Sequence, residues 1–161
     1  MRFINKELLQ ETISRAQVSP RQRTNYNFHL QLNDPLQRML NAIEPGSYIQ
    51  PHRHQAPDKR EAFIILSGKA IVVSFTGDGQ VKEHITLSQA GGNVGCEIPE
   101  GEFHTIIALE KGTVVYEVKD GPYSPMNDKD FAPWAPREGE KGTLEYMQQL
   151  LDRLGAGASA S

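Results

Sequence analysis

The sequence predicts a mainly β protein, a jelly-roll barrel or sandwich with a short helix near each end. The 161 residues include 14 glycines and 10 prolines, which indicate frequent turns. About eight or nine short segments between these turns alternate in polarity or are apolar, as strands do. Helical patterns occur only near the two ends. The length suits a single domain, and we expect one that spans residues 1–161.

Two helices are expected to flank the barrel. Asn5 is placed to cap the first, over about residues 5–16, whose apolar face stops before Ser19-Pro20. Thr143 is placed to cap the second, over about residues 144–154, with Gly155 beyond its end.

The barrel itself is expected over about residues 21–120, as a meander of antiparallel hairpins. Residues 63–66 are apolar on both faces, which is typical of a strand buried between two sheets. The expected strands cover residues 23–30, 37–44, 61–66, 69–75, 80–87, 94–98, 103–109 and 113–119.

A strap of residues 121–141 follows the barrel and is rich in proline and charge. Its prolines favour an extended chain, and Tyr123, Phe131 and Trp134 indicate that it packs on the barrel. We interpret it as a structural belt; the alternative is a lid that closes on a binding site.

Composition narrows the class of protein. A net charge of −3 and a pI near 5.9 argue against nucleic acid as the main partner. The single cysteine, Cys96, excludes an internal disulfide and fits a reducing compartment. No apolar run has the length of a membrane span, and the first ten residues lack the apolar run of a secretory signal. We expect a cytoplasmic protein with no membrane partner.

Three histidines and one glutamate form a candidate metal site. His52 and His54 are two residues apart, so on an extended segment both point to the same side. Glu61 opens the next expected strand, and His104 comes from a later segment. Three imidazoles and a carboxylate suit one divalent transition metal ion, and these donor types admit Zn, Fe, Mn or Ni.

The polar face of the strand at 23–30 is a candidate substrate-binding surface. An arginine beside two amides suits an anionic or polyhydroxylated ligand. The alternative is an ordinary half-exposed strand with its polar side in water. The residues of this face are Arg23, Asn25, Asn27 and His29.

Strand phase adds further candidates. Tyr48 and Gln50 share the phase of His52 and are expected to line the same opening. Glu117 and Lys119 share a face of the last strand, where they would act as a general base and its charge partner. The alternative for this second pair is a surface ion pair.

Two segments resemble the cupin motifs. Gly46, His52, His54, Glu61 and Gly68 follow the spacing of the first motif, with six residues between His54 and Glu61 where three or four are usual. The segment PEGEFH, which ends at His104, resembles the core of the second motif.

Three longer stretches resemble the WbuC-type cupin-fold metalloproteins over about residues 19–139. These stretches are SPRQRTNYNFH, QRMLNAIEPGSYIQPHRH and VKDGPYSPMNDKDFAPWAPREG. The resemblance implies a cupin barrel, a homodimer and a bound divalent metal, with His52, His54, Glu61 and His104 as ligands. Such proteins are often encoded among bacterial genes for O-antigen or other surface polysaccharides, which implies a carbohydrate-derived ligand.

Two functions follow from these observations. The first is a metal-dependent isomerase, epimerase, lyase or oxygenase that acts on a small polar substrate, either anionic or derived from a carbohydrate. The second is a non-catalytic module in which the metal and the polar row hold a small ligand or stiffen the barrel. A purely structural zinc site is disfavoured because such sites tend to be closed and rich in cysteine.

Overall fold

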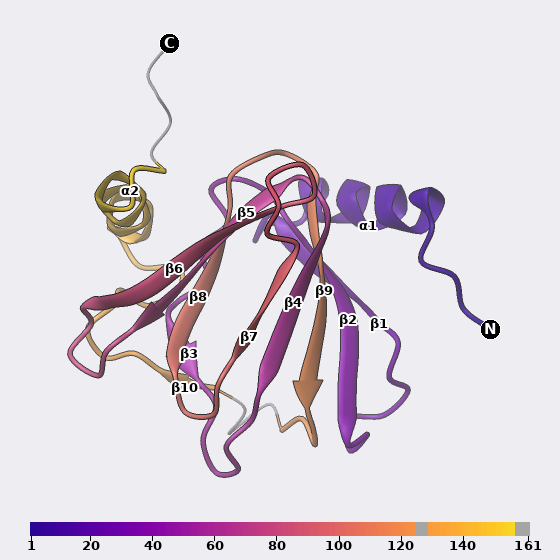
Figure 1. Cartoon of the computed structure of the whole chain (residues 1–161), viewed down its shortest axis with the longest axis horizontal. Coiled ribbons are helices and arrows are strands. Elements are labelled where there is room, and N and C mark those ends of the chain that lie inside the picture. The colour runs from indigo at the N-terminus through magenta and orange to yellow at the C-terminus, as the bar shows by residue number, and fades with distance from the viewer. Residues whose placement is uncertain (125–128, 157–161) are drawn as a thin grey trace.

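The fold is a sandwich of two five-stranded antiparallel sheets with a helix near each end of the chain (Figure 1). A computed structural model describes residues 1–124 and 129–156. The prediction of a mainly β jelly-roll architecture with flanking helices is confirmed. The helices are α1 (Lys6–Val18) and α2 (Thr143–Arg153), and the strands are β1 (Arg23–Asn27), β2 (Leu36–Ile43), β3 (His52–Arg53), β4 (Glu61–Ser67), β5 (Lys69–Phe75), β6 (Val81–Ser88), β7 (Gly95–Ile98), β8 (Phe103–Ala108), β9 (Thr113–Asp120) and β10 (Asp130–Phe131).

The strand order brings together segments that are distant in sequence. Sheet 1 has the order β1-β2-β9-β4-β7, and sheet 2 has the order β10-β3-β8-β5-β6. In sheet 2, His52 of β3 lies opposite His104 of β8. In sheet 1, Glu61 of β4 lies opposite Lys119 of β9. This register, with side chains alternating along each strand, sets which groups face the space between the sheets.

Apolar side chains from both sheets pack together in that space. The buried residues of this core are Ile43, Phe63, Ile65, Ala70, Val72, Leu87, Ile98, Ile106, Ala108 and Val115. Their removal from water is the main stabilising contribution to a sandwich of this kind.

Each sheet is also partly covered on its outer face. On sheet 1, Ile13 and Ala16 of α1 pack in a second buried cluster with Leu40 of β2. On sheet 2, Met147 and Leu150 of α2 belong to a third cluster with residues of β5 and β8. Figure 1 shows the two helices on opposite sides of the sandwich.

This outer cover corrects one prediction. The segment 63–66 was expected to be buried on both faces, but Ile64 of β4 is 45% exposed. The strands buried on both faces are β5 and β8 of sheet 2, because α2 and the strap cover their outer side. An apolar run alone did not distinguish β4 from these two strands.

Of the two helix N-caps predicted from the sequence, one is confirmed. Asn5 caps α1 as predicted, since its side chain accepts a hydrogen bond from the backbone N–H of Leu8 at 3.1 Å. The expected cap at Thr143 is wrong, because Thr143 is already the first helical residue of α2 and Gly142 occupies the cap position without a side-chain bond. Among the described helices, none is long and apolar enough to cross a membrane.

Residues 130–135 of the strap lie against sheet 2, whereas Glu138 contacts Arg23 of β1 in sheet 1. Strand β10 pairs with β3, and Ala132 and Ala135 are buried in the outer cluster. The Trp134 ring lies 5.0 Å from the Phe75 ring and 5.9 Å from the Phe103 ring, centroid to centroid. These contacts favour the belt interpretation for residues 129–136. Residues 125–128 of the predicted strap lie outside the described residues.

Candidate metal centre

The structure brings His52, His54, Glu61 and His104 into one cluster, hereafter the His–Glu cluster. Each residue offers one ligand atom, and these atoms all lie within 4.8 Å of one another. All four side chains are buried. A 2+ ion about 2.0–2.2 Å from each donor requires donor–donor separations of roughly 3–4.4 Å, so a shift of a few tenths of an ångström brings the whole set within the size of a metal site.

The two sheets contribute different members of the cluster. His52 and His104 face one another across β3 and β8 of sheet 2, with their ring centroids 4.8 Å apart. Glu61 begins β4 of sheet 1 and reaches across to the imidazoles of His54 and His104. Its carboxylate lies 3.0 Å from His54 Nε2 and 2.7 Å from His104 Nε2.

Backbone carbonyls orient two of the rings. His52 Nδ1 lies 2.9 Å from the carbonyl oxygen of Gln50, and His104 Nδ1 lies 2.9 Å from that of Glu102. A carbonyl can only accept, so Nδ1 carries the proton in both rings. This arrangement directs Nε2 toward the cluster as the metal-binding nitrogen, as outer partners of metal-bound histidines commonly do.

The pKa shifts of His52 and Glu61 suit a cation, whereas His104 would have to release a proton before it could coordinate one. Burial lowers the pKa of His52 well below its usual value, so this ring is neutral and can coordinate. Burial alone would raise the pKa of Glu61, but hydrogen bonds from His104 and His54 outweigh it and hold that pKa well below its usual value. The pKa of His104 is raised, because its bond to Glu61 outweighs the opposing effect of burial.

The His–Glu cluster forms one wall of a cavity of about 500 Å³, here called the central cavity. His52, Glu61 and His104 line it, beside the apolar side chains of Phe63 and Ile106. Three neutral imidazoles and one carboxylate would leave a divalent ion with about one net positive charge beside this space.

Most of the predicted substrate-binding residues also line the central cavity. These residues are Arg23, Asn25, Asn27, His29, Gln50 and Lys119, together with the predicted base Glu117. Tyr48 is the exception. Its hydroxyl donates to the carbonyl of Pro136 at 2.7 Å, and its ring packs in the outer cluster of sheet 2 near Tyr146.

The prediction for Tyr48 is wrong because residues 47–51 do not form a strand. Side chains alternate between two faces only where the chain is extended and regularly paired. The alternation counted back from His52 therefore holds as far as Gln50 and does not reach Tyr48.

Glu117 and Lys119 are not a surface ion pair, since they are 7% and 4% exposed. The Lys119 ammonium lies 3.7 Å from Glu61 Oε1 and 5.5 Å from the centre of the Tyr123 ring. Glu117 accepts a hydrogen bond from the Asn41 amide. Burial, together with repulsion from Glu61, raises the pKa of Glu117 to about 7.

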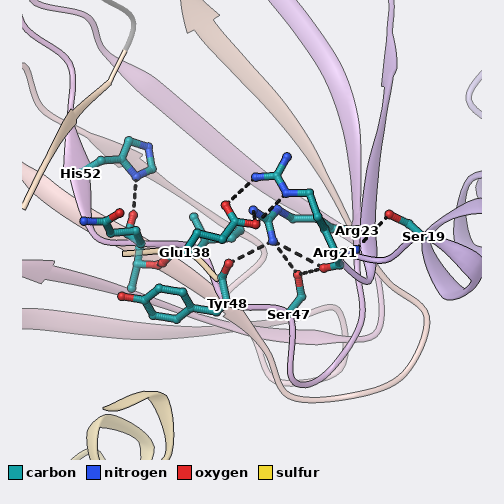
Figure 2. Close-up of polar contacts among 10 residues, drawn as sticks. Ser19, Arg21, Arg23, Ser47, Tyr48, His52 and Glu138 are labelled. Atoms are coloured by element: carbon teal, nitrogen blue, oxygen red, sulfur yellow. Dashed lines mark hydrogen bonds and ion pairs between the residues drawn. The ribbon is translucent and has the colours of Figure 1, made fainter. Parts of the chain in front are cut away.

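At the β1 end of the central cavity, Arg23 bonds to Glu138, to Ser47 and to the carbonyl of Tyr48 (Figure 2). His29 contacts the backbone of Arg38 through its Nδ1.

Several residues that line the cavity were not assigned to it from the sequence, among them Asn41, Lys129, Phe131 and Glu138. Asn41 lies opposite Asn25 in the register of β1 and β2, and the alternation of the second strand could have indicated it. The other three belong to the strap, whose irregular chain gives no periodicity from which to place a side chain.

A family model described as a domain of unknown function, DUF6016, matches residues 4–87. The chain belongs to the DUF6016 family. The matched region of this DUF6016 member contains His52, His54 and Glu61, and His104 lies beyond it. No curated protein matches the chain.

Solved structures similar to this DUF6016 chain share its cupin-type fold. TT1209 from Thermus thermophilus is 16% identical over 74% of this chain and 97% of its own, with a TM-score of 0.52. KdgF from Halomonas sp. is 18% identical over 66% of this chain and 85% of its own, with a TM-score of 0.50. Lactobacillus farciminis oxalate decarboxylase in complex with formate is 19% identical over 68% of this chain and 30% of its own, with a TM-score of 0.50.

Proposed function

We propose that this chain is a metal-dependent enzyme that acts on a small, polar, anionic substrate in the central cavity. The observation that carries the proposal is the buried His–Glu cluster in the wall of that cavity, with Glu117 and Lys119 buried in the same wall. A purely structural metal site would not need an adjoining polar cavity of about 500 Å³.

His52, His54, Glu61 and His104 are the residues that would hold the ion, with Zn, Fe, Mn and Ni as the candidate metals. A divalent ion bound there supplies Lewis acidity. The chain's own contribution is to fix the donors. The carbonyls of Gln50 and Glu102 keep two imidazoles turned toward the cluster, and Glu61 supplies the negative charge.

Glu117 is suited to move a proton to or from a substrate. A carboxyl group with a pKa of about 7 holds and releases a proton at neutral pH, which general acid–base catalysis requires. The Asn41 amide fixes the orientation of one carboxylate oxygen. The carboxyl group lies in a wall of the cavity, where it can reach a bound molecule.

Cations and amides in the cavity favour an anionic, hydroxyl-bearing substrate. Arg23, Lys119 and Lys129 supply positive charge, while Asn25 and Asn27 can donate to and accept from hydroxyl groups. The resemblance of three stretches to the WbuC-type proteins supports a carbohydrate-derived substrate of surface-polysaccharide metabolism, and a cytoplasmic homodimer as the working form. Isomerisation, epimerisation, lyase and oxygenase chemistry are the reaction classes to test.

The test begins with elemental analysis of protein purified without chelators, for which we expect about one metal ion per chain. A panel of sugar acids and activated sugars is then screened for turnover with the wild type, Glu61→Gln and Glu117→Gln. We expect turnover to be lost in both variants while circular dichroism shows the fold retained. A protein that neither contains nor takes up metal would refute the proposal. Variants that only weaken ligand binding, with no turnover by the wild type, would indicate a binding module.

A further inference from the structure

Glu138 joins two arginines at the β1 end of the central cavity (Figure 2). Its carboxylate accepts from Arg21 Nε and Nη2, both at 2.6 Å, and from Arg23 Nη2 at 2.7 Å. Two guanidinium groups around one oxyanion are the arrangement that proteins use to bind a carboxylate or a phosphate. Here the bound oxyanion belongs to the protein itself.

Hydrogen bonds to groups other than Glu138 hold the Arg23 guanidinium in place. Its Nη1 donates to Ser47 Oγ at 3.1 Å and to the carbonyl of Tyr48 at 2.9 Å, and the Ser47 hydroxyl donates to the carbonyl of Arg21 at 2.8 Å. The Arg23 side chain is 13% exposed. A guanidinium that is fixed and nearly buried needs an anion opposite it, whether or not Glu138 is that anion.

Glu138, in contrast, lies on a segment that can move without disturbing the core. Every residue from 137 to 142 is exposed, and Gly139 and Gly142 have positive φ angles of 87° and 95°. The nearest buried residues along the chain are Ala135 before this segment and Met147 after it. Displacing the Glu138 carboxylate therefore exchanges one set of charged hydrogen bonds for another and exposes no buried side chain.

We propose that Arg21 and Arg23 form an oxyanion subsite of the central cavity, and that the Glu138 carboxylate holds the place of a substrate carboxylate or phosphate. This inference deepens the proposed function and rests on it for the identity of the ligand as a substrate. The anionic group of the substrate displaces Glu138 and binds Arg23, while the reacting end lies at the His–Glu cluster.

The spacing of these two sites sets the length of the ligand. Arg23 bonds to the carbonyl of Tyr48, and His52 follows four residues later. Four residues span at most about 14 Å. A single elongated molecule, such as a sugar phosphate or a sugar acid of more than one ring, can bridge both sites within the cavity of about 500 Å³.

The experiment measures the binding of inorganic phosphate and, separately, of acetate to chelator-treated protein by isothermal titration calorimetry. Glu138→Gln removes the resident charge, so we expect it to bind at least one of the two anions roughly tenfold more tightly than the wild type. Glu140→Gln is the matched control, because it makes the same change of charge in the same exposed segment. We expect less than about a twofold gain from this control, since a solvent-exposed charge is screened.

Two double variants assign the gain to the arginines. Adding Arg23→Gln, or the more exposed Arg21→Gln, to Glu138→Gln is expected to abolish it. A gain with phosphate only identifies a phosphate group as the ligand, and a gain with acetate only identifies a carboxylate. The inference is overturned if Glu138→Gln gains no more than Glu140→Gln with either anion, or if the gain survives the loss of the arginines.

Metal content, measured on the same samples before the chelator is added, separates this inference from the proposed function. Wild-type metal content without the gain in anion affinity removes the subsite alone. The gain without any metal uptake removes the metal-dependent enzyme alone.

Discussion

His104 Nε2 lies 2.7 Å from Glu61 Oε2, although 43 residues and the space between two sheets separate the two residues in the fold. Neither side chain is more than 4% exposed. A buried imidazole–carboxylate contact of this kind is costly to desolvate and is retained where a cation or a proton is to be held.

Metal binding is expected to stabilise the protein through the His–Glu cluster. Adding Zn²⁺ or Mn²⁺ at about 100 times its Kd should increase the free energy of unfolding by about 2.7 kcal/mol in the wild type, because only the folded state assembles the donors. His104→Ala should lose most of this increase. The measurement is the rise in melting temperature of chelator-treated protein on metal addition. His84→Ala is the control, since His84 is exposed on β6. An equal rise in His104→Ala would place the metal elsewhere.

Glu117 is expected to make stability depend on pH. Its folded-state pKa is raised from 4.5 to about 7, so the folded protein binds this proton more tightly than the unfolded chain does. Its contribution is fully present below pH 4.5 and is lost as the pH rises through about 7.

The measurement for Glu117 is urea unfolding of chelator-treated protein at pH 5 and pH 8. Between these values the wild type should lose more stability than Glu117→Gln, whose amide does not titrate. Glu97→Gln, a change at an exposed position of β7, should behave as the wild type does. Equal losses in Glu117→Gln and the wild type would contradict the raised pKa.

Substitutions of glycine in the turn between β5 and β6 test whether Trp134 of the strap packs against this turn. A Cβ at Gly79 would lie 2.7 Å from the Trp134 ring, and the φ of Gly79 is +87°. Gly79→Ala should therefore cost about 1–3 kcal/mol of stability by chemical denaturation. Gly77→Ala, two residues earlier in the same turn, should change stability by less than about 0.5 kcal/mol, because a Cβ there meets nothing within 4 Å. A similar cost at both glycines would mean that Trp134 is not packed against this turn.

Trp134 also distinguishes a belt from a lid. It is the only tryptophan of the chain, so its fluorescence reports on the strap without labelling. Its ring packs on Phe75 and Phe103, and we expect its emission maximum to stay constant on addition of metal or phosphate and to shift only when the protein unfolds. A shift at low phosphate or metal concentration, with the fold intact, would favour a lid.

The sequence was sufficient for the parts of the fold that depend on local periodicity. Alternation in β1 and β2, and turn residues such as Gly68 between β4 and β5, are properties of a few neighbouring residues. The His–Glu cluster could also be predicted from the sequence, because His52 and His54 share a side of an extended segment and Glu61 and His104 lie in recognisable motifs.

Two kinds of feature could not be predicted from the sequence: those that depend on what packs against the outside of a strand, and those that lie in irregular chain. The exposure of Ile64 depends on what lies outside β4, and the pattern of apolar residues does not contain this information. The predicted direction of the Tyr48 side chain was wrong because residues 47–51 are not a strand. The contacts of Glu138 with Arg21 and Arg23 join residues more than 100 positions apart in the sequence. Such contacts are set by how the strap closes over the barrel rather than by any local pattern.

The division of the His–Glu cluster between β4 of sheet 1 and β3 and β8 of sheet 2 has a consequence for the lifetime of the protein. An ion bound there would cross-link the two sheets, which are otherwise held together by apolar packing. Proteolysis follows how often a protein opens, and an ion of this kind suppresses opening. Cellular abundance of the chain should then rise and fall with the supply of the ion, so starvation for metal would lower the amount of the protein itself.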